Sequence, residues 1–274
     1  YSSAASDVYK RQTPAYVNEN TLAVVVSMRG TKETIVAAQV AKDHGASTIA
    51  IYVDESGLTE VCDYKIQYDS LAVDESCMGR TNSAVVTMIA MELTQQTEGY
   101  AEYETAMAAF DLVDPIYRKA VEYTRPLAAK WAEQNADKPC INVMAQGPLF
   151  GAAYVFSICN VQEMLQIDSC TINTCDFFHG PFEVTDANTP FVIQVSEGST
   201  RELDERCLKF LHTYAKRIEV LDAKELGLSV IDPAVVDYFN HSLFNNVYPI
   251  YNHALAETRQ HPLTTRRYMW KVAY

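Results

Sequence analysis

Short runs of β-branched and aliphatic residues alternate along the chain with longer segments in which apolar residues recur every three or four positions. Runs of the first kind predict buried parallel strands, and segments of the second kind predict amphipathic helices. The first half has a strand over 22–26, a helix over 32–44 that ends at His44-Gly45, and strands over 47–53 and 64–68. A strand, a helix and a strand joined by tight turns form a βαβ unit.

The same order of elements returns in the second half. The pattern there predicts strands and helices over 141–145, 150–165, 169–173, 191–195, 200–216, 218–221 and 232–256. Residues 81–134 between the halves are helical in pattern and poor in glycine, and Pro115 and Pro126 within them predict helix starts or breaks. We therefore expect an α/β fold with two parallel sheets whose halves are joined by helices.

The first residues differ in character from the rest. Residues 1–12 (YSSAASDVYKRQ) have no apolar periodicity and are typical of foreign sequence joined to a coding fragment, or of an ordinary polar tail. If they are foreign, the natural protein is longer at its N-terminus. The remaining chain divides into a first domain over 13–112, which includes linking helices, and a second domain over 113–274.

Composition narrows the function classes. Hydrophobic residues make up 48% of the 274 residues and charged residues 21%, which is the balance of a globular protein. The formal net charge of −13 gives little attraction to nucleic acid or to an anionic membrane surface. The most apolar stretch, Pro148–Cys159, is too short to cross a bilayer. Seven cysteines without a C-x-x-C pair are typical of a reduced, cytoplasmic protein.

The turn between the first strand and the first helix could bind a phosphate group. Its hydroxyls, a glycine that lets the backbone approach a ligand, and N–H groups at a helix N-terminus all suit an anion. A plain Ser/Thr helix cap is the alternative, and the spacing of a Walker loop is absent. The candidate substrate-binding residues of this turn are Ser27, Arg29, Gly30, Thr31 and Lys32.

Two further groups contain ionisable side chains. Glu163 lies near the end of a largely apolar helix, where a carboxylate could shuttle a proton, and His179 follows two phenylalanines. In the basic, aromatic tail over 259–274, Arg267 could bind an anion and Lys271 could form an imine. The commoner alternatives are a solvated helix face for Glu163, a loop histidine that caps another group for His179, and a basic surface segment for the tail. The six histidines form no zinc-binding motif and the chain has no Rossmann G-x-G-x-x-G motif, so we expect neither a metal nor a cofactor.

Two parts of the chain resemble the sugar isomerase (SIS) family. Residues 24–57 resemble a βαβ unit of that family, whose Ser-x-Ser-Gly-x-Thr turn binds sugar phosphate. Gly147, Glu163 and, sixteen residues later, His179-Gly180-Pro181 resemble the isomerase half of glutamine–fructose-6-phosphate aminotransferase and the fructosamine-6-phosphate deglycases. The pair Arg267-x-x-x-Lys271 is similar to one near the C-terminus of those enzymes. Gly147 and the arginine of this pair are thus further candidate substrate-binding residues.

The resemblance covers about residues 13–274 and implies two three-layer αβα halves, the first of them incomplete. It implies that Ser27, Gly30 and Thr31 contribute to phosphate binding and that Glu163 moves a proton between C1 and C2 of the sugar. It also implies a homodimer in which His179 assists ring opening at the neighbouring subunit's site. Lys271 matches a lysine that forms an imine with the ketose in the aminotransferase.

The chain departs from the family pattern at the phosphate turn and before it. Arg29 and Lys32 stand where the family has Ser and Thr, and these cations could hold phosphate or a carboxylate. We expect the family's first βα unit, and any glutaminase domain, to be missing from this chain. The resemblance therefore implies a cytoplasmic deglycase that cleaves a 6-phosphorylated fructosamine, such as fructoselysine or glucoselysine 6-phosphate. The alternatives are a glucosamine-6-phosphate synthase or deaminase-type isomerase, and a non-catalytic sugar-phosphate sensor.

Overall fold

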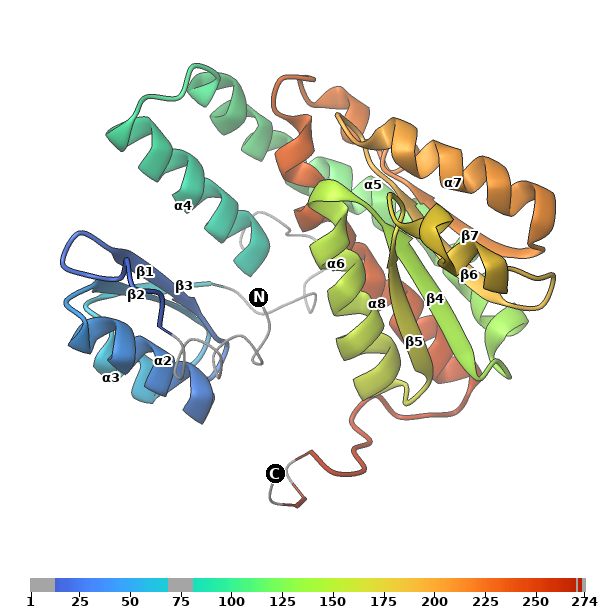
Figure 1. The fold of residues 1–274 in the computed structure, drawn as a ribbon, viewed down its shortest axis with the longest axis horizontal. Helices are drawn as coiled ribbons and strands as arrows, with labels where there is room; N and C mark the ends of the chain where they lie inside the picture. Colours follow the sequence, from blue (N-terminus) through green and yellow to red (C-terminus); the bar gives the residue numbers. More distant parts are fainter. Residues whose placement is uncertain (1–12, 69–80, 270, 273–274) are drawn as a thin grey trace. The chain divides into compact units, whose positions relative to one another are not determined.

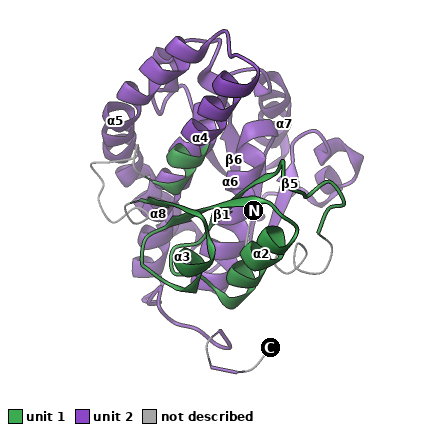
Figure 2. Cartoon of the chain, turned by 90° about the vertical axis from the view of Figure 1, so that its left-hand side faces the viewer, with its two compact units in different colours: residues 1–74, 80–86 green, residues 75–79, 87–274 purple. Residues whose placement is uncertain are grey.

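The computed structural model describes residues 13–68, 81–269, 271 and 272. The chain divides into two compact units, Tyr1–Asp74 with Arg80–Val86 and Glu75–Gly79 with Thr87–Tyr274 (Figure 2). The helical connection is made by α4 (Asn82–Thr97) and α5 (Tyr103–Asn135). The boundary expected after residue 112 lies within α5, and the expectation for residues 1–12 lies outside the described residues.

Unit 1 contains a three-stranded parallel sheet in the order β1-β2-β3 (Figure 1). Its elements are β1 (Leu22–Val26), α2 (Lys32–Asp43), β2 (Ser47–Tyr52), α3 (Gly57–Val61) and β3 (Tyr64–Gln67). Both crossovers advance across the sheet in the same direction, so right-handed connections place α2 and α3 on the same face. Ala38 of α2 and Leu58 of α3 pack there against Ala50 and Tyr52 of β2.

Unit 2 contains a four-stranded parallel sheet in the order β5-β4-β6-β7. Its strands are β4 (Cys140–Ala145), β5 (Asp168–Asn173), β6 (Pro190–Val195) and β7 (Arg217–Asp222). Its further helices are η1 (Gly147–Leu149), α6 (Phe150–Val155), η2 (Phe156–Met164), η3 (Phe177–His179), η4 (Pro181–Val184), α7 (Arg201–Tyr214), η5 (Leu228–Val230), η6 (Val236–Phe239) and α8 (Asn240–Thr258). The chain passes from β4 to β5 in one direction and from β6 to β7 in the other, so the connecting helices cover opposite faces.

The side chains of unit 2 confirm this layering. Alternate residues of a strand point to opposite faces of its sheet. Val143 and Val192 belong to the larger core, with α5, α6 and α8, whereas Met144 and Phe191 belong to the smaller core beneath α7. Unit 2 therefore has three layers, αβα. The predicted α/β class with two parallel sheets is confirmed, and each predicted strand is present with its ends within one residue.

The helix α5 continues through both of its prolines, so the expectation that Pro115 and Pro126 start or break helices is wrong. Each proline removes the N–H that would bond to the carbonyl four residues earlier, at Asp111 and Glu122. These four residues are exposed, so water can replace the missing donors. The opposite face of α5 is buried against α8, and this packing holds the helix together.

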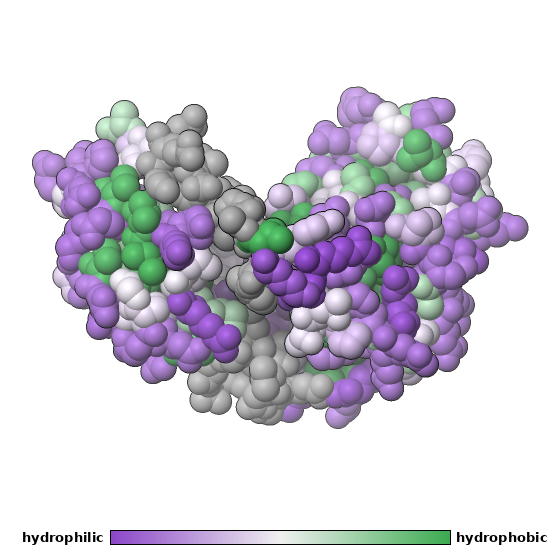
Figure 3. Space-filling view, turned by 90° about the horizontal axis from the view of Figure 1, so that it is seen from below, coloured by the Kyte–Doolittle hydropathy of each residue, from purple (hydrophilic) through white to green (hydrophobic). Residues whose placement is uncertain are grey.

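The exposed surface of the described part is mainly polar. On the face shown in Figure 3, hydrophilic side chains predominate and hydrophobic ones form small, separate patches. Exposed large apolar side chains, such as Val184, Val230 and Tyr268, are spread over different elements. Of the helices within the described ranges, none is both long and apolar enough to cross a membrane.

Candidate active site

The turn between β1 and α2 directs backbone N–H groups toward one point at a helix N-terminus. The hydroxyl of Ser27 accepts the N–H of Gly30 at 3.1 Å and the N–H of Thr31 at 3.4 Å, which fixes the shape of the turn. The side chain of Thr31 caps α2. Among the described residues, the next N–H groups, those of Lys32 and Glu33, meet no acceptor. The positive end of α2 is thus available to an anion.

Two of the predicted substrate-binding cations lie at the rim of this turn. Arg29 Nε lies 2.9 Å from Asp54 Oδ2, with the two side chains 80% and 57% exposed. Because exposed pairs of this kind contribute little energy, an anion can compete for Arg29. Lys32 is exposed at the first position of α2. A side chain at Gly30 would place its Cβ 2.3 Å from Ser56 Oγ, so only glycine fits at this position.

A turn of similar sequence, residues 196–200, joins β6 to α7 in unit 2. Both turns have Ser at the first position and Thr four residues later. In unit 2, however, the N–H of Ser199 donates to both carboxylate oxygens of Asp237, at 3.1 and 3.2 Å. The N–H of Glu197 donates to the side chain of Asn240 at 2.9 Å. Side chains from outside this second turn, those of Asp237 and Asn240, therefore accept its N–H groups, whereas in unit 1 the accepting side chains, Ser27 and Thr31, belong to the turn itself.

Gly147 lies beside this second turn, at the carboxyl end of β4. An added Cβ at Gly147 would lie 2.7 Å from Thr200 Cγ2. Beneath them, the fully buried carboxylate of Asp204 accepts hydrogen bonds from Thr174 Oγ1 at 2.8 Å and from Ser196 N–H and Oγ at 3.1 and 2.8 Å. Burial raises the pKa of Asp204, and these hydrogen bonds offset part of the shift. The turn after β6 is thus held by internal hydrogen bonds at the carboxyl end of the sheet.

Glu163 lies on the last turn of η2, which continues α6 with π-helical hydrogen bonding. Its side chain is 30% exposed, and its Oε1 lies 3.0 Å from Nη2 of Arg266, whose side chain is 12% exposed. Helical turns of the π type are rare and often occur at functional sites. Glu163 is therefore a partly buried carboxylate with one oxygen held by a cation from the tail.

The C-terminal tail returns to this end of η2 after α8. Gln166 Nε2 donates to the carbonyl of Thr265 at 3.3 Å, and Arg267 Nε donates to Gln166 Oε1 at 2.9 Å. Lys271 Nζ donates to the carbonyl of Arg266. The tail thus carries Arg267 and Lys271, two of the predicted site residues, to the turn that follows Glu163 (Figure 1 shows the tail).

His179 lies at the other end of β5. It is exposed at the end of η3, which follows the strand, whereas Glu163 precedes the strand. Six strand residues at about 3.3 Å each span about 20 Å. The structure therefore brings Glu163 and Lys271 of one chain into the same region. It leaves His179 of that chain near the opposite end of β5.

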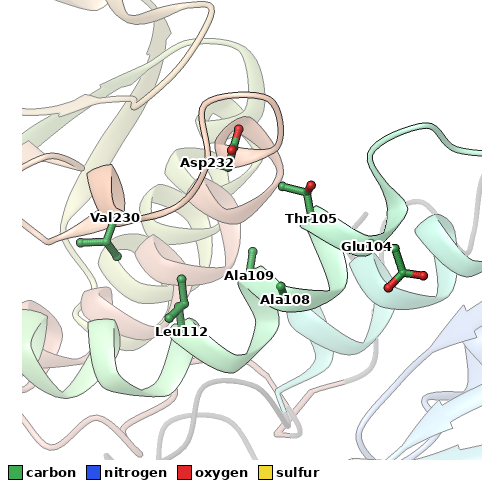
Figure 4. A pocket seen from close by; sticks show the side chains of 7 residues that line it. All are labelled: Glu104, Thr105, Ala108, Ala109, Leu112, Val230 and Asp232. Atoms are coloured by element: carbon green, nitrogen blue, oxygen red, sulfur yellow. The ribbon is translucent and has the colours of Figure 1, made fainter.

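A pocket of about 440 Å³ opens elsewhere in unit 2, between α5 and the segment that precedes η6 (Figure 4). It is lined by Glu104, Thr105, Ala108, Ala109, Leu112, Val230 and Asp232. None of the predicted site residues lines it. Within the described ranges, no three His, Cys, Asp or Glu side chains gather as metal ligands would.

Arg266 is the contact of Glu163 that the sequence analysis missed. The sequence favoured its neighbour Arg267, on the resemblance to an Arg-x-x-x-Lys pair. In an irregular or extended segment, adjacent side chains point in different directions, so a pair of adjacent arginines can serve two partners. Here Arg266 contacts Glu163 and Arg267 contacts Gln166. The adjacent pair of arginines was the available signal.

Comparison with known proteins identifies close relatives, although no family model matches the chain. The chain is 37% identical over 276 residues to fructosamine deglycase FrlB of Bacillus subtilis (strain 168), which covers 98% of this chain and 84% of the relative. It is 25% identical over 220 residues to fructoselysine 6-phosphate deglycase of Escherichia coli (strain K12). That match covers 78% of this chain and 62% of the relative.

Solved structures show the same relationship. A protein of Salmonella typhimurium LT2 described as a phosphosugar isomerase matches with a TM-score of 0.93 and 38% identity, over 98% of this chain and 83% of its own. The C-terminal domain of glucosamine-fructose-6-phosphate aminotransferase from Francisella tularensis matches with a TM-score of 0.77 at 13% identity, over 94% of this chain and 76% of its own, which shows a common fold. The chain belongs to the fructosamine deglycases, enzymes of the sugar isomerase (SIS) family.

Proposed function

We propose that the chain is a deglycase that converts a 6-phosphorylated fructosamine into a hexose 6-phosphate and a free amine. The observation that carries this proposal is the partly buried carboxylate of Glu163, held by Arg266 in a region that the tail also supplies with Arg267 and Lys271. A single positioned carboxylate is the group that a proton transfer between adjacent carbons requires. The named deglycase activity of the relatives supports the same assignment.

The reaction follows from proton transfers by that carboxylate. Glu163 takes a proton from C1 of the open-chain ketoamine, and the C2 oxygen gains a proton, which gives an enaminol with a C1–C2 double bond. Glu163 then returns its proton to C2, and the nitrogen lone pair forms the C1–N double bond of a protonated imine. Water adds to C1 and the C1–N bond breaks, which releases the amine and leaves an aldehyde. C1 is oxidised and C2 is reduced, so no external oxidant is needed.

Lys271 has a role in this scheme that does not require an imine. The ketoamine already carries nitrogen at C1, and its C2 carbonyl must gain electron density as the C1 proton leaves. A lysine ammonium beside that oxygen would stabilise the developing charge. Lys271 reaches the region of Glu163 on the docked tail, and Arg267 on the same tail offers a second cation for substrate.

The phosphate of the substrate is assigned to the turn between β1 and α2. Its support is the contrast between the two turns of similar sequence. In unit 1 the N–H of Lys32 meets no acceptor within the described residues, whereas the N–H at the equivalent position of the unit 2 turn, that of Arg201, donates to the carbonyl of Gly198 at 3.3 Å. A phosphate at a helix N-terminus gains both from such N–H groups and from the helix dipole.

The active enzyme is proposed to be a homodimer in which His179 acts at the site of the other subunit. About 20 Å of strand separates the ends of β5 that carry Glu163 and His179, which is too far for both side chains of one chain to contact one sugar. His179 is exposed and therefore accessible to a second copy. Its role there is to donate and accept the proton that opens the sugar ring.

Mixing two inactive variants tests this arrangement. Glu163→Gln and His179→Ala are each expected to lose most of their turnover as homodimers. In a mixed dimer one site carries both changes and the other carries neither, so random reassociation should restore about a quarter of wild-type activity. No recovery from mixed dimers would show that both residues act within one chain, and wild-type turnover of either homodimer would show that the residue changed in it is not needed.

The chemistry needs only proton transfer and water, so the proposal assigns no metal or organic cofactor to the site. A cytoplasmic location is proposed as well. Its support is that the described cysteines are free thiols, the usual state in a reducing compartment.

The activity is tested directly with two substrate mixtures. The protein is incubated with fructoselysine 6-phosphate or with fructose 6-phosphate plus ammonia, and sugar phosphates and amines are followed by mass spectrometry. Release of lysine and hexose 6-phosphate from the first mixture is the expected result. Formation of an amino sugar from the second mixture, without release of lysine from the first, would instead assign the chain to synthesis. Binding without turnover of either would make it a sensor.

A further inference from the structure

Arg266 is held in place more firmly than a surface arginine. Its side chain is 12% exposed, whereas that of the adjacent Arg267 is exposed. Arg266 Nη1 donates to the carbonyls of Leu263 and Thr265, at 2.7 and 2.9 Å. The other terminal nitrogen, Nη2, lies 3.0 Å from Glu163 Oε1. The planar guanidinium is thus fixed by the tail's own backbone, and its remaining edge points at the carboxylate.

This geometry gives the two carboxylate oxygens of Glu163 different roles. Oε1 is taken by Arg266, while Oε2 has no hydrogen-bond partner among the described residues. A carboxylate held at one oxygen cannot rotate freely about its last bonds, so the second oxygen keeps a fixed direction. That second oxygen is the one available to carry a proton between two carbons of a substrate.

The tail is also attached at two points just before this contact. His261 Nε2 lies 3.1 Å from the carbonyl of Met164, and Gln166 Nε2 donates to the carbonyl of Thr265. Lys271 Nζ donates to the backbone carbonyl of Arg266. One residue therefore links the two ionisable groups of the proposed site, since its side chain contacts Glu163 and its backbone contacts Lys271.

We propose that Arg266 is a positioning residue, which orients the Glu163 carboxylate and makes that orientation depend on the docked tail. The inference rests on the proposed function, because Arg266 acts on the reaction only through Glu163. Loss of the guanidinium lets the carboxylate leave its productive position. A displacement of about 1 Å at a reacting group lowers the rate by up to about 100-fold. We therefore expect a lower kcat with little change in KM.

The test compares three single variants in the full chain, with fructoselysine 6-phosphate as substrate. Arg266→Gln should lower kcat by about 10- to 100-fold and change KM by less than about twofold. Arg266→Lys, which keeps a cation, should recover part of the lost kcat. Arg217→Gln is the matched control, because Arg217 Nη1 also donates to a backbone carbonyl of unit 2, that of Gln134 at 2.7 Å, without contacting Glu163. Its kcat should equal that of the wild type.

A double variant separates positioning from a general structural effect. Glu163→Asp shortens the side chain, so its carboxylate no longer reaches the guanidinium. Adding Arg266→Gln to Glu163→Asp should therefore lower kcat by less than about twofold, because the shared contact is already lost. A full additional loss in the double variant would overturn the inference, and so would wild-type kcat in Arg266→Gln.

Different results would refute this inference and the proposed function. If Glu163→Gln is inactive while Arg266→Gln is fully active, the function stands and the role of Arg266 is refuted. If Glu163→Gln retains wild-type turnover, Glu163 is not the proton carrier, and both the proposed mechanism and the role of Arg266 are refuted.

Discussion

Replacing Gly30 by alanine should disturb the phosphate turn in a way that can be calculated from the structure. Gly30 has a φ of +62°, a left-handed conformation that costs an L-residue about 1 to 2 kcal/mol. The new Cβ would also lie 2.3 Å from Ser56 Oγ and 3.0 Å from Ser56 Cβ. Ser56 must therefore move, and this residue is the N-cap of α3, with its Oγ accepting the N–H of Leu58.

The cost of the left-handed backbone at residue 30 and the cost of displacing Ser56 add. Loss of a serine cap costs about 1 kcal/mol, and the lower chain entropy of alanine in the unfolded state returns somewhat less than 1 kcal/mol. The expected net loss is about 2 kcal/mol in the free energy of unfolding. Because Gly30 lies in the turn whose N–H groups are proposed to hold phosphate, its displacement should also weaken binding of fructose 6-phosphate by at least about tenfold.

Urea unfolding and calorimetric titration with fructose 6-phosphate measure both effects. The control is Gly99→Ala, since Gly99 has a φ of +81° but no atom within 4 Å of an added Cβ. That variant should lose only about 1 kcal/mol, from the backbone alone, and should bind the sugar phosphate normally. Equal stability of the two variants, or unchanged binding in Gly30→Ala, would refute the reasoning about this turn.

Three further predictions concern single side chains. Glu163→Gln should reduce turnover to background while the Kd for hexose 6-phosphate stays within about twofold; an equal loss of both would indicate a structural role. Hydrogen bonds from Lys42 and Thr48 lower the pKa of Asp63 to about 2 in the folded protein, against about 4 in the unfolded chain. The ionised carboxylate therefore stabilises unit 1 above about pH 4, and this stability is lost as the pH falls toward 2. Asp63→Asn should therefore be less stable at pH 7 and show a flatter loss of stability between about pH 4 and 2 in acid unfolding. Asp237→Ala should lose about 1 to 2 kcal/mol in urea unfolding, because the Ser199 N–H loses its acceptor; unchanged stability would mean that the turn is open to solvent in the wild type.

The regular elements were accessible from sequence because their signals are local. The runs of Val and Ile in β4 and β6 are buried on a parallel sheet, whereas β1, predicted as a buried strand, is an edge strand with Leu22 and Val26 exposed. The helical spacing predicted the ends of α2 and α7 to within two residues. The prolines of α5 do not break the helix because a proline's effect depends on where the lost hydrogen bond points. Pro115 and Pro126 lie on the exposed face, a fact that depends on the packing of α5 against α8.

Contacts between the candidate site residues also depend on tertiary packing that the sequence does not show. Glu163 and Lys271 were found through motif spacing, but Arg266 was not, because its contact joins residues 103 positions apart. The hydrogen bond from the second turn to Asp237 joins residues 38 positions apart. Such pairings follow from tertiary structure, and no periodicity in either segment indicates them. The roles of Ser27, Arg29 and Lys32 in binding substrate stay predictions.

The most direct test of the account is a reaction of fructoselysine 6-phosphate in deuterated water, followed by NMR of the hexose 6-phosphate. A carboxylate that carries the proton from C1 to C2 exchanges with solvent while it does so. The account therefore predicts equal amounts of lysine and hexose 6-phosphate, deuterium at C2 of the product, and no product from Glu163→Gln. Product formed by Glu163→Gln at the wild-type rate, or no cleavage by the wild type, would contradict the central claim that Glu163 drives deglycation.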